Sequence, residues 1–295
     1  MYFGFADYNK AFDSIEHQFL WRALRDAKIE EKYLRILRYV YENSKARIKM
    51  EKTSRWFKIG RGVKQGDPLS PKLFNAALEK VFKSMNWEGK GIKIGSNFLN
   101  ELRFADDVII ISQDKDELKN LTKDLIVRSK DAGLSMNMSK TKMMTNCNDV
   151  SFWIDNQEIE IVNEFKYLGQ IESFEDSEMK EINIRIKNSW KIFWSMKKFF
   201  KSDLPQFHKK RLFDSCVAPV LTYGSQCWTM SKTTCERIEV EQHAMERTML
   251  GLSLMDNINN KKLRKLSQVK DAMTTAKSLK WNWANAHFNW TSAES

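Results

Sequence analysis

The 295-residue chain has only 4 Cys, 4 Pro and 11 Gly, and it has no long apolar run. Its cysteines, Cys147, Cys216, Cys227 and Cys235, form no C-x-x-C pair and have no matching His pair. This spacing argues against a zinc site or a disulfide framework and predicts buried, reduced thiols. The longest aliphatic run, 108–111, is far shorter than the ~20 residues of a membrane-spanning helix. The N-terminus carries charged residues where a secretory signal is apolar, so we expect a soluble, intracellular protein without a membrane partner, in nucleus or cytoplasm.

What the chain has in excess is positive charge. It carries 49 Lys and Arg against 38 Asp and Glu, a net charge of +11, and an acidic partner such as nucleic acid is expected. Two stretches are especially basic: 185–211 has nine basic residues and one acid, and 261–280 has seven and one. We predict that Lys197, Lys198 and Lys201 in the first contact nucleic acid. Aromatic and aliphatic residues of the same stretch recur at helical spacing, which indicates core packing. The alternative is that its basic face is only solvated.

Two kinds of pattern divide the chain. Helical and extended patterns alternate up to about residue 170, and nearly all of the rest is typical of helices. The first part predicts strands over 2–8, 46–50, 55–59, 99–104, 108–112, 142–145, 151–161 and 165–171, with helices over 14–43, 73–85 and 115–132. The second part predicts helices over 178–201, 205–217 (ending before Pro219) and 233–250. We therefore predict an α+β fold, with a boundary near 172–178.

The most informative residues are carboxylates at strand ends. Asp106 and Asp107 lie on a tight step between two apolar strands, and Asp7 ends another apolar run. Adjacent carboxylates repel each other in a partly dry site unless a cation is present. Two strand ends that supply carboxylates suit a pair of Mg²⁺ ions, or Mn²⁺ in their place, which take oxygen ligands and can clamp a phosphoryl displacement. The alternative for Asp106 and Asp107 alone is an exposed hairpin turn.

A glycine-rich loop over 60–71 lies between the two acidic strands. Its glycines let the backbone approach a flat ligand, and Gln65 offers both a donor and an acceptor. Ser70 and Pro71 can begin the helix that follows. Taken alone, this segment could be only a loop with a good helix start.

Together these segments resemble reverse transcriptases. Asp7-x-x-Lys10-Ala11-Phe12-Asp13, Gln65-Gly66-Asp67-Pro68-Leu69-Ser70-Pro71 and Phe104-Ala105-Asp106-Asp107 match three core motifs of that family in order and spacing, most closely those of non-LTR, LINE-type retrotransposons. Residues 133–142 resemble the fourth palm motif and 165–169 the primer-grip hairpin. Segments within 220–228, 246–251 and 279–284 resemble the region after the palm. The resemblance covers almost the whole chain.

The resemblance implies a right-hand polymerase palm over 1–172 that lacks most of the fingers, followed by an all-α thumb-like region over 178–295. Its implied activity is primer extension with deoxynucleoside triphosphates on an RNA template. Asp7, Asp106 and Asp107 would be the catalytic carboxylates and the ligands of two Mg²⁺ ions. Phe12, Gln65, Gly66 and Lys140 would contact the nucleotide or the template. Tyr167, Leu168 and Gly169 would form the primer grip.

Two departures from the family pattern affect the functional prediction. Complete enzymes carry fingers strands before the first Asp motif, so we expect a truncated copy, or a fragment of a polyprotein that relies on another segment or chain for its fingers. Phe104 replaces the more frequent Tyr. The leading hypothesis is a reverse transcriptase fragment. The alternative is a catalytically inactive, transposon-derived remnant that binds nucleic acid through its basic face, and a purely structural protein is a third possibility.

Overall fold

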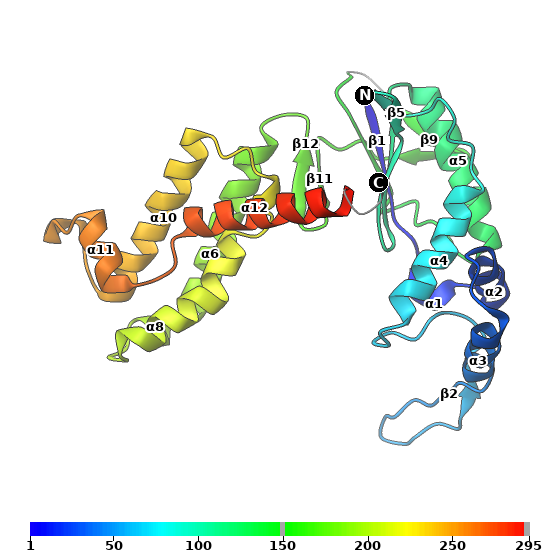
Figure 1. The fold of residues 1–295 in the computed structure, drawn as a ribbon, viewed down its shortest axis with the longest axis horizontal. Coiled ribbons are helices and arrows are strands. Elements are labelled where there is room, and N and C mark those ends of the chain that lie inside the picture. Colours follow the sequence, from blue (N-terminus) through cyan, green and yellow to red (C-terminus); the bar gives the residue numbers. More distant parts are fainter. Residues whose placement is uncertain (148–150, 292–295) are drawn as a thin grey trace. The chain divides into compact units, whose positions relative to one another are not determined.

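The computed structural model describes residues 1–147 and 151–291, the last five of these through their backbone alone. The chain forms two compact units, 1–174 and 175–295 (Figure 1). The division falls inside the segment 172–178, where the sequence predicts a boundary. The predicted α+β class is confirmed, because the first unit combines antiparallel strands with helices and the second is helical.

The centre of the first unit is a four-stranded antiparallel sheet in the order β6-β7-β1-β8. Its strands are β6 (Glu101–Phe104), β7 (Asp107–Ser112), β1 (Tyr2–Ala6) and β8 (Lys142–Thr145). Ala6 pairs with Val108, and Phe5 pairs with both Ile109 and Lys142. Because successive side chains of a strand point to opposite faces, alternate residues of each strand lie on the two faces of the sheet.

Helices cover one face of this sheet. These are α2 (His17–Asp26), α4 (Ser70–Lys83) and α5 (Lys115–Asp131), and they pack on Ala6, Val108, Ile110 and Met143 in the main core. α5 packs closely on β1 at Gly4, where a Cβ would meet Leu118 at the van der Waals distance of 3.4 Å. Two helix boundaries agree with the sequence: α4 begins at Ser70, and α5 ends just before the left-handed Gly133.

Short hairpins cover the opposite face. They are β4–β5 (Ile92–Ile94 and Asn97–Leu99) and β11–β12 (Glu164–Tyr167 and Gln170–Ser173). The ring of Phe5 stacks on that of Phe165, with centroids 4.0 Å apart. These contacts belong to a second core that contains Phe5, Ile109, Ile111 and Met144. The β4–β5 hairpin was not predicted.

The helix predicted over 14–43 is wrong as a single element. The chain forms α1 (Ala11–Ser14), α2 and α3 (Glu31–Glu42) instead. Glu16 leaves the helical conformation because its N–H donates to the carbonyl of Ala132, 2.9 Å away, and Lys28 adopts a left-handed φ of 63°. Tertiary bonding and a left-handed turn therefore override an apolar pattern that runs through both breaks.

The remaining predicted strands are present but shorter. β2 (Lys45–Ala46) and β3 (Phe57–Lys58) form the ends of an extended hairpin, and the predicted strand over 151–161 is a hairpin of β9 (Phe152–Ile154) and β10 (Gln157–Ile159). Asp155 and Asn156 at its tip both have positive φ, as a tight two-residue turn requires.

The second unit is helical throughout. Its α-helices are α6 (Ser177–Ser195), α7 (Lys197–Phe200), α8 (Gln206–Leu212), α9 (Ala218–Leu221), α10 (Lys232–Leu250), α11 (Asn260–Ser267) and α12 (Ala272–Thr291). The prediction that a helix ends before Pro219 is wrong: a π-helical turn (Phe213–Val217) leads straight into α9, which contains Pro219. Short 3₁₀ turns (Ser225–Cys227 and Leu254–Asp256) complete the unit.

The apolar stripe of α6 and α7 packs into the core of this unit, as predicted. Ile182 and Ile186 belong to one buried cluster, and Phe193 and Phe200 belong to another. The rings of Phe193 and Phe200 stack with centroids 4.4 Å apart. Four lysines between these positions are exposed, namely Lys187, Lys191, Lys197 and Lys198, whereas Arg185 is buried and pairs with Glu181.

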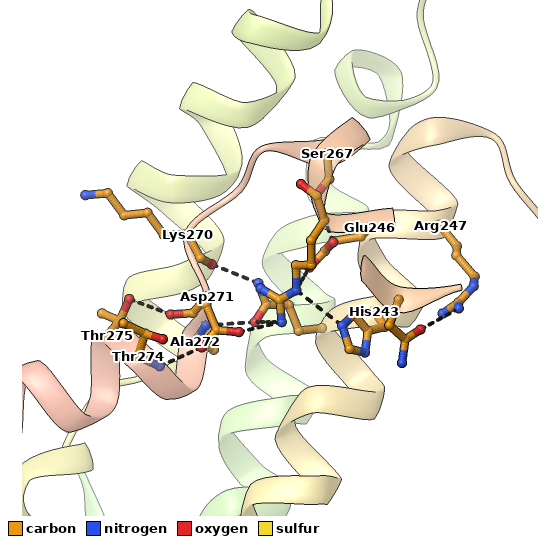
Figure 2. A network of polar contacts seen from close by, with 12 residues as sticks. His243, Glu246, Arg247, Ser267, Lys270, Asp271, Ala272, Thr274 and Thr275 are labelled. Carbon is orange, nitrogen blue, oxygen red and sulfur yellow. Dashed lines mark hydrogen bonds and ion pairs between the residues drawn. The ribbon is translucent and has the colours of Figure 1, made fainter. Parts of the chain in front are cut away.

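A polar network around Arg264 joins α10, α11 and the start of α12 (Figure 2). The guanidinium contacts Asp271 Oδ2 at 2.7 Å, Glu246 Oε1 at 3.4 Å and His243 Nε2 at 3.2 Å. Ser267 donates to the second oxygen of Glu246 at 2.8 Å. Burial, and then the charge of Arg264, lowers the pKa of His243 to about 4, so this imidazole is neutral and accepts the bond.

All four cysteines are free, but the prediction that they are buried is wrong. Cys147 lies just after the end of β8, Cys227 ends a 3₁₀ turn, and both are exposed. Cys216 and Cys235 are half-buried. Within 1–147 and 151–291, no helix has the length and apolar character needed to cross a bilayer.

Candidate polymerase site

The predicted carboxylates lie at one edge of the central sheet. Asp7 directly follows β1, and Asp107 begins β7. Because these strands are antiparallel and Ala6 pairs with Val108, the end of β1 meets the start of β7. Asp106 precedes Asp107 in a turn that starts at Ala105, whose φ is 54°. Residues a hundred positions apart are thus brought to one place, although the structure does not test their roles.

The carboxylates influence one another electrostatically. Burial, and then the negative charges of Asp106 and Asp7, raises the pKa of Asp107. Oδ2 of Asp7 is buried and has no hydrogen-bond partner among the described residues. A buried oxygen that accepts no hydrogen bond and lies next to other carboxylates fits the oxygen chemistry of a hard divalent cation.

The fit to a metal rests on this chemistry rather than on a closed ligand cage. Across residues 1–147 and 151–291, no three His, Cys, Asp or Glu side chains gather closely enough to hold an ion by themselves. Asp7, Asp106 and Asp107 are the groups that would hold a cation here.

A cavity of about 450 Å³ opens beside these carboxylates. Asp7, Asp107, Lys140 and Tyr167 line it, and these are four of the residues predicted for the site. Nζ of Lys140 lies 3.7 Å from Oδ2 of Asp7. The side chain of Lys140 is 68% exposed, so its ammonium group can turn from Asp7 toward a ligand in the cavity.

The segment that carries Lys140 is fixed to the end of β1 by its backbone. Asn137 N–H donates to the carbonyl of Asp7 at 2.7 Å, and Asn9 N–H donates to Ser135 at 2.8 Å. Gly133 lets this segment pass close to the backbone of Ser14. Its φ is 79°, and a Cβ there would lie 2.7 Å from the carbonyl oxygen of Ser14. Backbone hydrogen bonds thus join the first predicted motif, 7–13, to the fourth, 133–142.

The glycine-rich loop is held against α1 on the other side. Gly62 N–H donates to Ile15 and Val63 N–H donates to Phe12, each at 2.7 Å. Gly62 has φ of 83°, and a Cβ there would meet the backbone oxygen of Asp13 at 2.6 Å, so only glycine fits. Nε2 of Gln65 donates to Asp13 Oδ1 at 3.3 Å.

Phe12 and Gly66 differ in their surroundings. The ring of Phe12 is half-buried and stacks on Phe74, with centroids 4.4 Å apart, so core contacts fix its position. Gly66 is exposed with φ of 85°, and a Cβ there would meet nothing within 4 Å. Its need for glycine therefore comes from backbone conformation alone. The roles of both residues stay predictions.

The predicted primer grip is a β-hairpin that faces the carboxylates. Leu168 and Gly169, with φ of 48° and 85°, form the tight turn between β11 and β12. Burial, followed by the charges of Asp107 and Glu172, raises the pKa of Tyr167 to about 12. The Tyr167 hydroxyl is therefore protonated at neutral pH, near the carboxylate edge.

One charged cluster beside the site was not predicted. Arg103 forms ion pairs with Glu79 at 2.9 Å and Glu101 at 3.0 Å, and its guanidinium lies 4.4 Å from the ring centroid of Phe82. Burial, opposed by Arg103, raises the pKa of Glu101 to about 7. Strand alternation puts positions 101 and 103 on one face of β6, and that signal could have indicated the pair.

In the second unit, Lys197, Lys198 and Lys201 are all exposed. The ammonium groups of Lys197 and Lys201 lie 6.0 and 5.7 Å from the ring centroid of Trp194, which is itself 44% exposed. The structure thus places these three lysines on an accessible surface. It does not test whether they bind nucleic acid.

A known protein family matches most of the first unit. Residues 1–171 match the family described as reverse transcriptase (RNA-dependent DNA polymerase), which is more than half of the chain. The chain belongs to the reverse transcriptase family. The sheet that carries the three Asp residues is therefore the palm of the right-hand polymerase fold, while the limits 1–172 and 178–295 for palm and thumb stay predictions.

Relatives of this reverse transcriptase sequence come from transposable elements. It is 30% identical over 203 residues to an uncharacterised transposon-derived protein of Caenorhabditis elegans, covering 65% of this chain and 73% of that protein. It is 32% identical over 186 residues to the Pol polyprotein of the R2 retrotransposable element of Nasonia vitripennis, covering 58% of this chain and 18% of the polyprotein. R2 elements are non-LTR retrotransposons, so the LINE-type resemblance is confirmed. The chain spans only a small part of these polyproteins.

Among solved structures, this reverse transcriptase chain is similar to telomerase of Candida tropicalis in complex with a fragment of telomeric RNA. The TM-score is 0.47 at 16% identity, and the match covers 95% of this chain and 45% of that one.

Proposed function

We propose that the chain is the polymerase part of a retrotransposon reverse transcriptase. It would join deoxynucleotides to a primer 3′ hydroxyl on an RNA template, with deoxynucleoside triphosphates as substrates. The observation that carries the proposal is the meeting of Asp7, Asp106 and Asp107 at one sheet edge, beside a cavity of about 450 Å³.

Each side chain of this edge has a role in the proposal. Asp7 and Asp106 would supply oxygens to two Mg²⁺ ions, and Asp107 would complete the carboxylate set. When bound, the ions would lower the pKa of the primer hydroxyl and offset charge on the leaving pyrophosphate. Lys140, 3.7 Å from Asp7, is placed to donate a proton to that pyrophosphate. Tyr167, Leu168 and Gly169 hold the primer end.

The remaining roles concern the incoming nucleotide. The Phe12 ring, fixed by its stack on Phe74, would exclude a ribose 2′ hydroxyl. Gln65 and Gly66 lie on the exposed loop tip and would contact the nucleotide and the template. These roles come from the family resemblance and are supported by the position of each residue around one site.

Primer extension tests the proposal. The purified full chain is incubated with oligo(dT) annealed to poly(rA), dTTP and Mg²⁺, beside Asp106→Ala and the control Asp131→Ala. Asp131 is an exposed residue at the end of α5 and lines a different cavity, with Arg22 and Lys80. We expect metal-dependent extension by the wild-type chain and the control and none by Asp106→Ala. Equal products from all three, or none from the wild-type chain, would contradict the proposal for this chain.

A second candidate is a catalytically inactive remnant that binds nucleic acid. The observation that favours it is the exposed group of Lys197, Lys198 and Lys201 around Trp194. A remnant of this kind would bind nucleic acid with an affinity that falls steeply as salt rises, and it would extend no primer.

A further inference from the structure

The hairpin over 44–61 carries an unusual share of the protein's charge. Seven of its eighteen residues are basic and one is acidic, so its net charge is +6 against +11 for the whole chain. The basic residues are Lys45, Arg47, Lys49, Lys52, Arg55, Lys58 and Arg61, and the acid is Glu51. Among the described residues none of these seven cations forms an ion pair with a carboxylate. The hairpin is therefore a concentrated source of unneutralised positive charge.

The hairpin also exposes large apolar side chains. Residues 47–61 are all exposed, including Met50 at 76%, Trp56 at 60% and Phe57 at 48%. It projects beyond the end of α3, away from the sheet of its own unit (Figure 1). Exposed aromatic and apolar side chains concentrated on one projecting element are typical of a binding surface.

The hairpin keeps its shape through its own backbone bonds. Ile59 N–H donates to the carbonyl of Ser44 at 3.2 Å, and Ser54 N–H donates to that of Ile48 at 2.8 Å. Trp56 lies across from Arg47, whose guanidinium carbon is 4.8 Å from the indole centroid. Since the indole is still 60% exposed with Arg47 in place, much of the ring is open to solvent.

We propose that this hairpin binds single-stranded RNA. Unpaired bases stack on the open part of Trp56, while Arg47 and the neighbouring cations contact the phosphates. Aromatic stacking combined with a basic surface is a general solution for binding single strands, because every base has a flat face and every linkage carries a charge. The strong positive charge favours this partner over a neutral apolar one.

The position of the hairpin connects this contact to the polymerase site. Its second strand continues into the glycine-rich loop, and Arg61 lies four residues before Gln65. The backbone bond from Gly62 to Ile15 anchors that connection to the segment next to α1. A strand on the hairpin would therefore lie close to the residues proposed to contact the template. The choice of RNA rests on the proposed function, but the binding surface does not.

Fluorescence anisotropy with a labelled RNA of about 20 unpaired nucleotides tests the charge contribution on the full chain. The test variant is Arg47→Ala/Lys49→Ala/Lys52→Ala, and the control with the same charge change is Lys93→Ala/Lys119→Ala/Lys130→Ala, outside the hairpin. We expect the test variant to bind about tenfold more weakly and to reduce the slope of log affinity against log salt by about 2, since each lost phosphate contact removes ~0.7. The control should retain the wild-type slope. Equal losses in both variants would overturn the proposal.

Trp56→Ala tests stacking, with Trp153→Ala, which is 46% exposed on β9, as the matched control. We expect roughly a fivefold or greater loss for Trp56→Ala, little change for Trp153→Ala, and recovery in Trp56→Phe because the ring is kept. Wild-type affinity in Trp56→Ala overturns the stacking contact. If RNA affinity is unchanged in every hairpin variant, the surface serves another partner and the proposal is wrong.

Binding and polymerisation are separable in this test. Asp106→Ala should extend no primer yet bind RNA as the wild-type chain does, because Asp106 lies outside the hairpin. An inactive wild-type chain that still shows the hairpin-dependent affinity would contradict the proposed function and leave the RNA contact standing.

Discussion

Neutralising Asp107 should make the metal-free protein more stable and the Mg²⁺-bound protein less so. Asp7 follows Ala6, and Asp107 precedes its partner Val108, so the two residues lie opposite each other where paired Cα atoms of antiparallel strands are ~5 Å apart. Two like charges at that distance repel by ~0.8 kcal/mol in water and ~3 kcal/mol at an effective dielectric constant of 20. Asp107 is exposed, so the lower value applies. Asp107→Asn should therefore stabilise the metal-free first unit by about 1 kcal/mol, or raise its Tm by roughly 2–4 °C.

In Mg²⁺ the wild-type protein should be more stable than Asp107→Asn. For a dissociation constant of ~1 mM, 10 mM Mg²⁺ stabilises the wild-type protein by about 1.4 kcal/mol, and a variant that lacks one carboxylate gains less than half of this. Thermal unfolding in EDTA and in 10 mM MgCl₂ at pH 7.5 measures both effects, with Asp131→Asn as a control of equal charge change. A variant that is less stable than wild type in EDTA, or that gains as much from Mg²⁺, would refute the reasoning.

The pH dependence provides a second check on the same variant. The folded protein raises the pKa of Asp107 above its unfolded value, so the folded state favours the protonated form. The destabilising charge is absent below the unfolded pKa and fully present once the pH has risen through the folded pKa. In EDTA, the stability difference between Asp107→Asn and wild type should shrink as the pH falls through that window. A difference that does not change with pH would contradict this cause.

Two further predictions concern the second unit. Charge reversal at Lys197, Lys198 and Lys201 should weaken binding to nucleic acid of any sequence by filter binding, whereas unchanged affinity would show that this face is only solvated. Arg264→Met should lower the free energy of unfolding by about 3 kcal/mol at pH 8, because it leaves the buried carboxylate of Glu246 without its cation. Burial already raises the pKa of Glu246, so the stability lost in Arg264→Met should be smaller at pH 5. Adding Glu246→Gln should restore part of the lost stability. Equal losses in urea titrations at pH 5 and pH 8 would contradict an unpaired Glu246 carboxylate as the cause.

The sequence predicted the sheet and its carboxylate edge because both depend on local signals. Apolar strand patterns surround Asp7 and Asp107, and an antiparallel arrangement brings their ends together. Helix ends at Ser70 and Gly133 follow from proline and glycine chemistry that is visible in the chain. Local rules sufficed wherever a residue's own backbone preference decided the structure.

Other features depend on contacts that no local pattern contains. The break at Glu16 needs the carbonyl of Ala132, more than a hundred residues away. At the open end of the β4–β5 hairpin, Gly91 approaches the carbonyl of Leu99 so closely that a Cβ there would lie 2.4 Å from that oxygen. The raised pKa of Glu101 arises from burial beside β6, which composition does not indicate.

The exposed hairpin over 44–61 shows a further limit of sequence patterns. The sequence predicts short strands over 46–50 and 55–59, yet residues 47–61 are exposed and belong to no core cluster. The hairpin forms a candidate binding surface because Trp56 is exposed and Arg47 lies opposite it, and the sequence pattern indicates neither feature.

Single-nucleotide incorporation tests the polymerase assignment most directly. A labelled DNA primer on an RNA template is mixed with the full chain, one matching dNTP and Mg²⁺, and the product one nucleotide longer is quantified. We predict Mg²⁺-dependent incorporation by the wild-type chain and by Asp131→Ala, and its loss in Asp106→Ala. Product that persists in Asp106→Ala, or a wild-type chain that forms none, would contradict a polymerase centred on Asp7, Asp106 and Asp107.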